Sequence, residues 1–150
     1  MIKNKIYFAG PLFSKAERDY NQELTLKIEN IDYKVFLPQR DGAELDKPPY
    51  QGMTQSERNK AIFSLDVKQV LNCDIFLFVL DGRVPDEGAC FELGIAYSKK
   101  SQDNSKKHII GLHTDMRASF INSKLNAMIE GPFDKIFISE KDLIDYLNQI

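Results

Sequence analysis

Hydrophobic and polar residues along this chain alternate in blocks of two kinds. Five short runs are almost continuously apolar and rich in Ile, Val and Phe; they cover residues 5–10, 33–38, 73–81, 107–113 and 135–139. Strands have this composition when both faces of their sheet are covered, as in parallel sheets. The segments between the runs carry apolar residues at helical spacing instead. The pattern therefore predicts alternating strands and helices.

The starts of several helices can be read from the residues that would cap them. Three segments begin with a hydroxyl residue that is followed three positions later by an acid, namely Ser14 with Glu17, Thr54 with Glu57, and Ser139 with Asp142. In such a capping box the hydroxyl accepts a hydrogen bond from a free backbone N–H, and the acid favours the positive helix end. Asp86, which follows Pro85, can cap a fourth helix. A fifth helix is expected within residues 115–131.

This order of elements predicts an α/β fold. Strand–helix–strand units with right-handed crossovers give a doubly wound, three-layer sandwich, here a flavodoxin-like parallel sheet of five strands. Ligands of such folds bind beyond the carboxyl ends of the strands. Four loops reach that edge, and we expect the chemistry there; their sequences are "AGPLFS", "PQRDG", "DGRVPDEG" and "HTD".

Length and composition fit one globular domain spanning residues 1–150. The chain is 43% apolar and 28% charged, and its net charge of −2 gives no reason to expect nucleic acid or an anionic membrane as a partner. We find no apolar run near 18 residues and no signal peptide, so we expect a cytoplasmic protein. Cys73 and Cys90 lie in apolar surroundings, where free buried thiols are more usual than a disulfide or a metal site.

Two carboxylates stand on helix faces that are otherwise apolar. Glu92 shares a stripe with Ala89, Leu93 and Ala96, and Asp66 lies between Ile62 and Val70 at a spacing of four. An ionised acid that faces a core is costly unless it is paired or lines a polar cavity. Either acid alone could cap or pair at the edge of the sheet. Together, after a loop with four charged residues, they indicate a functional site.

Several other chemistries lack their signatures. No GxxxxGK[ST], GxGxxG or GxSxG pattern is present, and His108 and His113 have no metal-ligand spacing, so we expect them in the core or at its edge. Carboxylate chemistry without a metal remains. A buried glutamate can attack a glycosidic carbon while a nearby acid moves the proton.

Three stretches carry a resemblance to a known family. "KIYFAGPLF", "DGRVPDEGACFELGIAYS" and "LNAMIEG" together resemble the nucleoside 2-deoxyribosyltransferases, from residue 6 to about residue 131. The resemblance implies a flavodoxin-like enzyme that exchanges the base of 2′-deoxynucleosides for a free base, with no metal and no organic cofactor.

The resemblance also implies site residues. Glu92 is the nucleophile that forms a covalent deoxyribosyl ester, and Asp66 exchanges a proton with the departing and incoming base. Tyr7 orients Glu92, and Asp86 contacts a sugar hydroxyl. Asn126 reaches the 5′-hydroxyl from a neighbouring subunit, which implies a homo-oligomer with shared sites.

Further substrate-binding residues are expected around these positions. They are Gln39, at the end of the second strand, with Gly10, Gly88 and Met128. Gln39 offers both donors and an acceptor, which suits the edge of a base. Arg40 could join it, or could be a surface residue that pairs with Asp41.

Two other functions stay open at this point. One is hydrolysis of the N-glycosidic bond of (deoxy)nucleoside 5′-monophosphates, for which Ser14, Lys15 and Arg18 are possible phosphate ligands. Asn126 favours a free 5′-hydroxyl instead. The other is a non-catalytic nucleotide-binding module, which would not need both Asp66 and Glu92.

Overall fold

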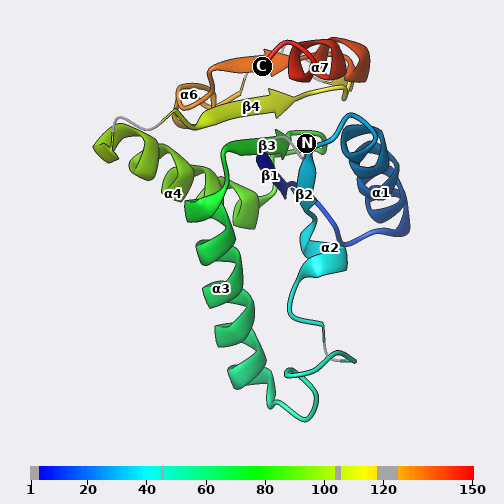
Figure 1. Cartoon of the computed structure of the whole chain (residues 1–150), viewed down its shortest axis with the longest axis vertical. Coiled ribbons are helices and arrows are strands. Elements are labelled where there is room, and N and C mark those ends of the chain that lie inside the picture. Colours follow the sequence, from blue (N-terminus) through cyan, green and yellow to red (C-terminus); the bar gives the residue numbers. More distant parts are fainter. Residues whose placement is uncertain (1–3, 45, 104–105, 118–124) are drawn as a thin grey trace.

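The computed structural model describes residues 4–44, 46–103, 106–117 and 125–150 (Figure 1). Its strands are β1 (Lys5–Ala9), β2 (Lys34–Phe36), β3 (Ile75–Val79), β4 (His108–Leu112) and β5 (Lys135–Phe137). They form one parallel sheet in the order β2-β1-β3-β4-β5, and each lies inside one of the five apolar runs. The predicted flavodoxin-like sheet is confirmed.

The described helices are α1 (Lys15–Glu29), α2 (Pro38–Asp41), α3 (Gln55–Asn72), α4 (Glu87–Asp103), α6 (Ala127–Glu130) and α7 (Glu140–Leu147). Four of them, α1, α3, α4 and α7, begin where the capping residues predict. Complete capping boxes start α1 at Ser14 and α3 at Thr54, and the Ser139 side chain accepts from the backbone of Asp142. These side chains satisfy N–H groups that have no partner inside the helix.

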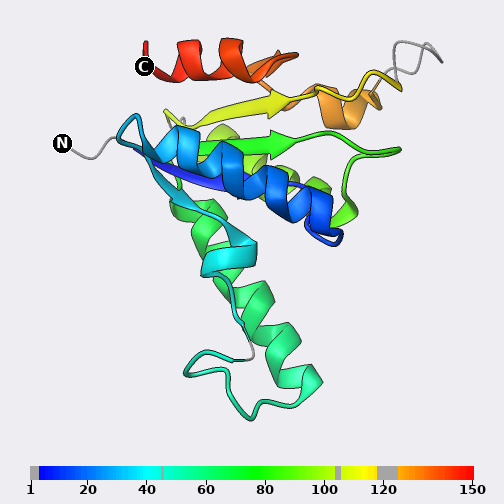
Figure 2. The same ribbon diagram turned by 90° about the vertical axis from the view of Figure 1, so that its right-hand side faces the viewer.

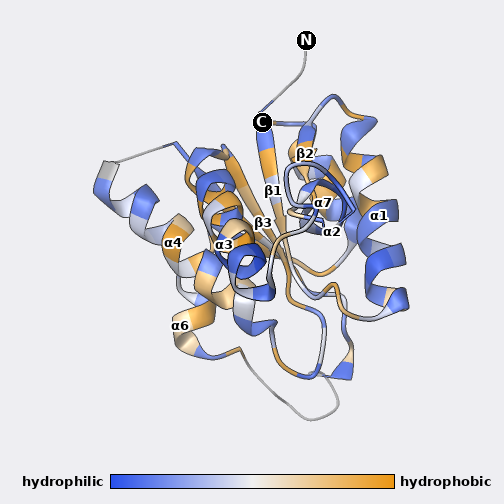
Figure 3. Ribbon diagram, turned by 90° about the horizontal axis from the view of Figure 1, so that it is seen from below, coloured by the Kyte–Doolittle hydropathy of each residue, from blue (hydrophilic) through white to orange (hydrophobic). Residues whose placement is uncertain are grey.

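The sheet is covered on both faces because successive strand side chains point to opposite sides. On one face Ile6 and Phe8 of β1 pack with residues of α1 and α7. On the other, Tyr7 and Ala9 pack with residues of α3 and α4. Figure 3 shows the apolar residues gathered along the strands, with a mostly hydrophilic outer side on α1. The α3/α4 face is therefore where β1 meets the helices that bear the two candidate acids.

Three features differ from the sequence prediction. The loop after β2 contains the short helix α2, which Pro38 can start because its fixed φ suits the first helical position. The helix predicted within residues 115–131 falls partly on 118–124, outside the described residues; in its described part, Arg117 is helical and α6 covers Ala127–Glu130. Cys73 is buried as expected, but Cys90 is only half-buried; both are free thiols.

The first half of α3 extends away from the sheet. Figures 1 and 2 show it reaching beyond the other elements, together with the segment that links it to α2. In the described part of the chain, no helix is long and apolar enough to cross a membrane.

Candidate active site

A cavity of about 530 Å³ opens beside the carboxyl ends of β1 and β2 and runs along α3 and the start of α4. Strand order reverses between β1 and β3, and their following loops diverge there, which leaves room for a ligand. Residues from three of the four predicted loops line the cavity. The fourth loop, residues 113–115, does not; Thr114 instead donates its backbone N–H to Asp81 Oδ1 at 2.6 Å.

Glu92 lines this cavity and is bonded to a buried tyrosine. The hydroxyl of Tyr7 donates to Glu92 Oε1 at 2.7 Å. Tyr7 is 0% exposed, and its ring stacks between Phe36 and Phe76 with centroids 5.6 and 5.8 Å away. A ring held in this way fixes the direction of its hydroxyl. One oxygen of Glu92 is thus positioned by a rigid donor.

The surroundings of Glu92 disfavour ionisation of its carboxyl group. Burial raises its pKa to about 7; the Tyr7 hydrogen bond opposes this shift, while the charges of Asp66 and Asp86 add to it. The phenol pKa of Tyr7 is also raised, first by burial and then by the Glu92 charge, so Tyr7 stays a donor. An ionised carboxylate that is desolvated and positioned in this way can act as a nucleophile.

Asp66 of α3 lines the same cavity. Its Oδ1 atom is buried and has no hydrogen-bond partner among the described residues. Burial alone raises the pKa of this carboxyl to about 6. An acid with such a pKa can both give and take a proton near neutrality.

Asp86 and the glycines shape the mouth of the cavity. Asp86 Oδ2 accepts from the Ala89 N–H at 2.9 Å, which caps α4 as predicted, and burial raises the pKa of the carboxyl. Gly10 has φ +150°, and a Cβ there would lie 3.1 Å from Val79 Cβ. This position at the end of β1 therefore requires glycine. Gly88 also lines the cavity, beside Asp86.

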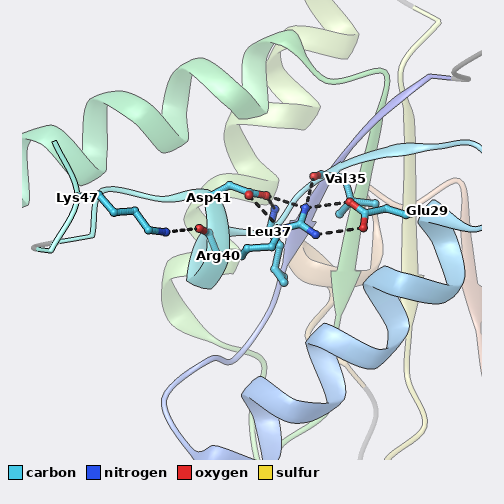
Figure 4. A network of polar contacts seen from close by, with 6 residues as sticks. All are labelled: Glu29, Val35, Leu37, Arg40, Asp41 and Lys47. Carbon is cyan, nitrogen blue, oxygen red and sulfur yellow. Dashed lines mark hydrogen bonds and ion pairs between the residues drawn. The ribbon is translucent and has the colours of Figure 1, made fainter. Parts of the chain in front are cut away.

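The two candidate residues after β2 have different surroundings. Gln39 lines the cavity, where its Nε2 donates to the Arg18 carbonyl at 2.8 Å and its Oε1 accepts from Asn21 at 3.1 Å. Part of its hydrogen-bonding capacity thus holds α2 against α1. Arg40 does not line the cavity. Its guanidinium pairs with Glu29 and Asp41, so the surface alternative holds (Figure 4).

Asn126 and Met128 lie outside the cavity of their own chain. Asn126 is exposed, and its Oδ1 accepts from the Met128 N–H at 2.9 Å, which caps α6. The side chain of Met128 is 81% exposed. A single chain therefore brings together Tyr7, Gln39, Asp66, Asp86, Glu92 and both glycines, but not these two residues.

Sequence reasoning missed the part of the cavity wall formed by the first turns of α3. Arg58 and Asn59 line it, together with Ile62 and Phe63. Arg58, Ile62 and Asp66 are spaced four apart, so they continue one stripe of the helix. Extending the apolar stripe one turn back from Ile62 would have found Arg58.

The chain is similar to proteins of known sequence and structure. The sequence pattern of the nucleoside 2-deoxyribosyltransferases matches residues 6–135. A conserved protein from Enterococcus faecalis has a similar structure, with a TM-score of 0.78 and 31% identity over 97% of this chain and 98% of that one.

Two further solved structures share the fold. One is a 2-deoxyribosyltransferase from Bacillus psychrosaccharolyticus, with a TM-score of 0.75 and 20% identity over 95% of this chain and 91% of that one. The other is a CMP N-glycosidase from Clostridium botulinum, with a TM-score of 0.54 and 19% identity over 97% and 98%.

Proposed function

Because the chain belongs to the nucleoside 2-deoxyribosyltransferase family, we propose that it transfers the 2-deoxyribosyl group between the bases of 2′-deoxynucleosides. The observation that carries the proposal is the Tyr7–Glu92 hydrogen bond at the cavity wall. It holds a desolvated carboxylate in position, as a nucleophile at a glycosidic carbon requires. Asp66 lies on the same cavity with a free, buried oxygen.

The reaction would proceed in two displacements. The Glu92 carboxylate attacks the anomeric carbon, the N-glycosidic bond breaks, and the departing base takes the proton of Asp66. A second base then attacks the deoxyribosyl ester, gives a proton to Asp66 and releases Glu92. Two inversions retain the β-configuration, and the first base leaves before the second binds, which makes the kinetics ping-pong.

The sugar would be fixed by groups around the anomeric centre. Asp86 stands directly before α4, six residues or about 1.7 helical turns before Glu92, and its carboxylate can accept a hydrogen bond from a sugar hydroxyl. We assign the 5′-hydroxyl to Asn126 of a second copy, with Met128 beside it. Both residues are exposed and stand outside the cavity of their own chain, so a neighbouring copy is needed to bring them to a site.

Hydrolysis of nucleoside 5′-monophosphates is the second candidate, because the CMP N-glycosidase has a similar fold. The three possible phosphate ligands after β1 are all engaged within the chain. Ser14 caps α1, Lys15 pairs with Asp19, and Arg18 donates to backbone carbonyls. Because these side chains already have partners, the arrangement favours a substrate with a free 5′-hydroxyl over one with a 5′-phosphate.

An exchange assay separates these functions. The protein is incubated with a 2′-deoxynucleoside and a different free base, and the products are resolved by chromatography. A new deoxynucleoside means transfer, and loss of base without exchange means hydrolysis. If nothing changes with nucleosides or nucleotides, both enzymatic candidates are wrong.

Glu92→Ala tests the nucleophile. We expect the variant to fold and to lose transfer, because alanine suits a helix interior. Mass spectrometry of the wild-type protein with a deoxynucleoside should find a deoxyribosyl adduct on the peptide that contains Glu92. Glu130→Ala, an exposed glutamate of α6, is the matched control. An adduct on another acid would refute the assignment.

A further inference from the structure

We propose that Arg58 determines which bases the enzyme accepts, by donating a hydrogen bond to a carbonyl oxygen on the far edge of the base. The enzyme would then prefer 6-oxopurines, such as hypoxanthine and guanine, to the 6-aminopurine adenine. This inference rests on the proposed transfer function and on the assignment of Asp66 to the base. It adds a specificity residue that the sequence did not suggest.

The position of Arg58 places it on the base side of the cavity. Arg58 and Asp66 line the same cavity from the same stripe of α3, eight residues apart, which is ~12 Å along the helix axis. If Asp66 bonds one nitrogen of the base, a group two turns away faces the opposite edge. A purine bonded at both ends spans this distance better than a pyrimidine does.

The state of the Arg58 side chain indicates that a partner is missing. Its Nε atom is buried and has no hydrogen-bond partner among the described residues. Glu44 also lines the cavity, yet no ion pair joins it to Arg58 in the described part of the chain. A buried donor without a partner is costly, so a ligand acceptor here gains more than it would at the surface.

Three of the other four arginines are engaged, and the fourth, Arg83, is exposed and does not line the cavity. Arg18 donates to the carbonyl of Phe13, Arg40 pairs with Glu29 and Asp41, and Arg117 pairs with Asp115. The unpaired Nε at Arg58 is therefore not the general state of arginine in this fold. The arginine with the unpaired, buried Nε is the one that lines the cavity.

The neighbouring residue offers donors as well. The side-chain oxygen of Asn59 already accepts from Gln55 Nε2 at 2.8 Å, which leaves the amide NH₂ of Asn59 for a ligand. Arginine has donors only. This end of the cavity therefore suits a base edge that carries acceptors.

Base chemistry then decides the preference. The O6 and N7 atoms of guanine are both acceptors and form the best-known specific contact of arginine with a base, whereas adenine presents an N6 amino group that donates. Two donors facing each other in a buried site leave both without partners. Hypoxanthine has the same O6 and N7 as guanine and lacks the 2-amino group, so it is the simplest probe.

The test compares acceptor bases in the exchange reaction. With 2′-deoxyguanosine as the donor, kcat/KM is measured for hypoxanthine and adenine as acceptors in the wild-type protein, Arg58→Ala and Arg58→Gln. We expect the wild type to prefer hypoxanthine by about tenfold to hundredfold, and Arg58→Ala to lose that preference mainly through hypoxanthine. Arg58→Gln should reduce the preference for hypoxanthine, because the amide oxygen of glutamine can accept a hydrogen bond from the amino group of adenine.

Controls separate specificity from folding and from the underlying activity. Lys60→Ala, an exposed change on the same helix, should keep the wild-type ratio. Thermal unfolding should show Arg58→Ala to be as stable as the wild type; if it is not, Arg58→Gln decides. Absence of exchange with every base would refute the proposed function. Exchange with an unaltered hypoxanthine-to-adenine ratio in the variants, or a wild type without preference, would refute only the role of Arg58.

A final experiment tests whether Arg58 binds the phosphate of a nucleotide instead of the base. The same variants are assayed with 2′-deoxyinosine and its 5′-monophosphate as donors. We expect any effect of Arg58→Ala to be equal for the two donors. A KM that rises only for the monophosphate would make Arg58 a phosphate ligand and overturn the proposal.

Discussion

Glu92 combines a functional advantage with a cost in stability. The same burial that desolvates the carboxylate raises its pKa from the ordinary value of 4.5 to about 7, so the folded state binds its proton more tightly than the unfolded state does. Stability from this group is then present below pH 4.5 and is lost as the pH rises towards 7. An isosteric neutral residue would avoid this loss.

We predict that Glu92→Gln stabilises the protein at pH 8. The amide keeps an acceptor for Tyr7 but does not ionise, so the free energy of unfolding should rise by about 1–3 kcal/mol at pH 8 and change little at pH 4. Urea unfolding at both pH values measures the difference. Glu130→Gln serves as the exposed control, and an equal gain at both pH values would show that ionisation of Glu92 is not the cause.

Tyr7 should set the pH at which Glu92 becomes active. Its hydrogen bond favours the ionised form, so Tyr7→Phe should raise the pKa of Glu92 and move the acid limb of kcat/KM to higher pH. A shift of about one unit gives about a tenfold loss at pH 6 and a smaller one at pH 8.5. The measurement is a pH–rate profile of the exchange reaction.

Tyr33→Phe is the matched control for this profile. Tyr33 is also buried, but it lies on the other face of the sheet, where its hydroxyl donates to the Leu147 carbonyl at 2.7 Å. Tyr33→Phe should lower the free energy of unfolding and leave the acid limb of kcat/KM at the same pH. A profile of Tyr7→Phe that drops equally at every pH would mean that Tyr7 does not act through ionisation.

At the scale of elements, α3 carries the residues that we assign to the base. Asp66 lies in its second half, whereas Arg58 and Asn59 lie in its first half. The first half of α3 extends away from the sheet (Figure 2). That part has few core residues to hold it, since Val70 is the only fully buried residue of the described helix. The capping box at Thr54 therefore matters more here than at a helix end that lies on the core.

We predict that Thr54→Ala loosens the start of α3. Loss of the side-chain hydrogen bond should cost about 1 kcal/mol and speed amide hydrogen exchange in residues 55–59. Transfer to hypoxanthine should weaken with it, because Arg58 lies in the loosened turn. Ser139→Ala removes an equivalent cap from α7, on the other face, and should not change transfer. Equal effects of the two variants on transfer would contradict this view of α3.

At the scale of the whole molecule, the proposed role of Asn126 requires a second copy of the chain. Asn126 and Met128 are exposed and do not line the cavity, while other large apolar side chains near its rim are also exposed, with Phe13 at 74% and Phe91 at 59%. Exposed apolar residues around a cavity favour contact with another protein surface. A second copy that covers them could bring its own Asn126 to the sugar.

Complementation between inactive variants tests this arrangement. Glu92→Ala and Asn126→Ala are each expected to be inactive. When they are mixed under conditions that let subunits exchange, some sites should combine an intact Glu92 with an intact Asn126 from the partner, and activity should return. Light scattering establishes the oligomeric state. A mixture without activity despite confirmed exchange, or a fully active monomer, would exclude shared sites.

Local patterns in the sequence determined the fold of this protein. The five apolar runs, the capping residues Ser14, Thr54 and Ser139, and the place of Asp66 and Glu92 on apolar stripes all depend on neighbours a few positions away. Periodicity and capping act over such distances, so these features could be predicted. Arg58 escapes this kind of prediction because it is a polar residue one turn before the apolar residues of the α3 stripe.

Only the tertiary structure decided which side chains meet. Tyr7 and Glu92 are 85 positions apart, and their hydrogen bond exists because Tyr7 points to the sheet face that α4 covers. Arg40 pairs with Glu29, and Asn126 does not line the cavity of its own chain, for reasons that no local pattern contains. Contacts of this kind depend on how whole elements pack. The candidate acids could therefore be predicted from the sequence alone, whereas their hydrogen-bond and ion-pair partners depend on the packing of the elements.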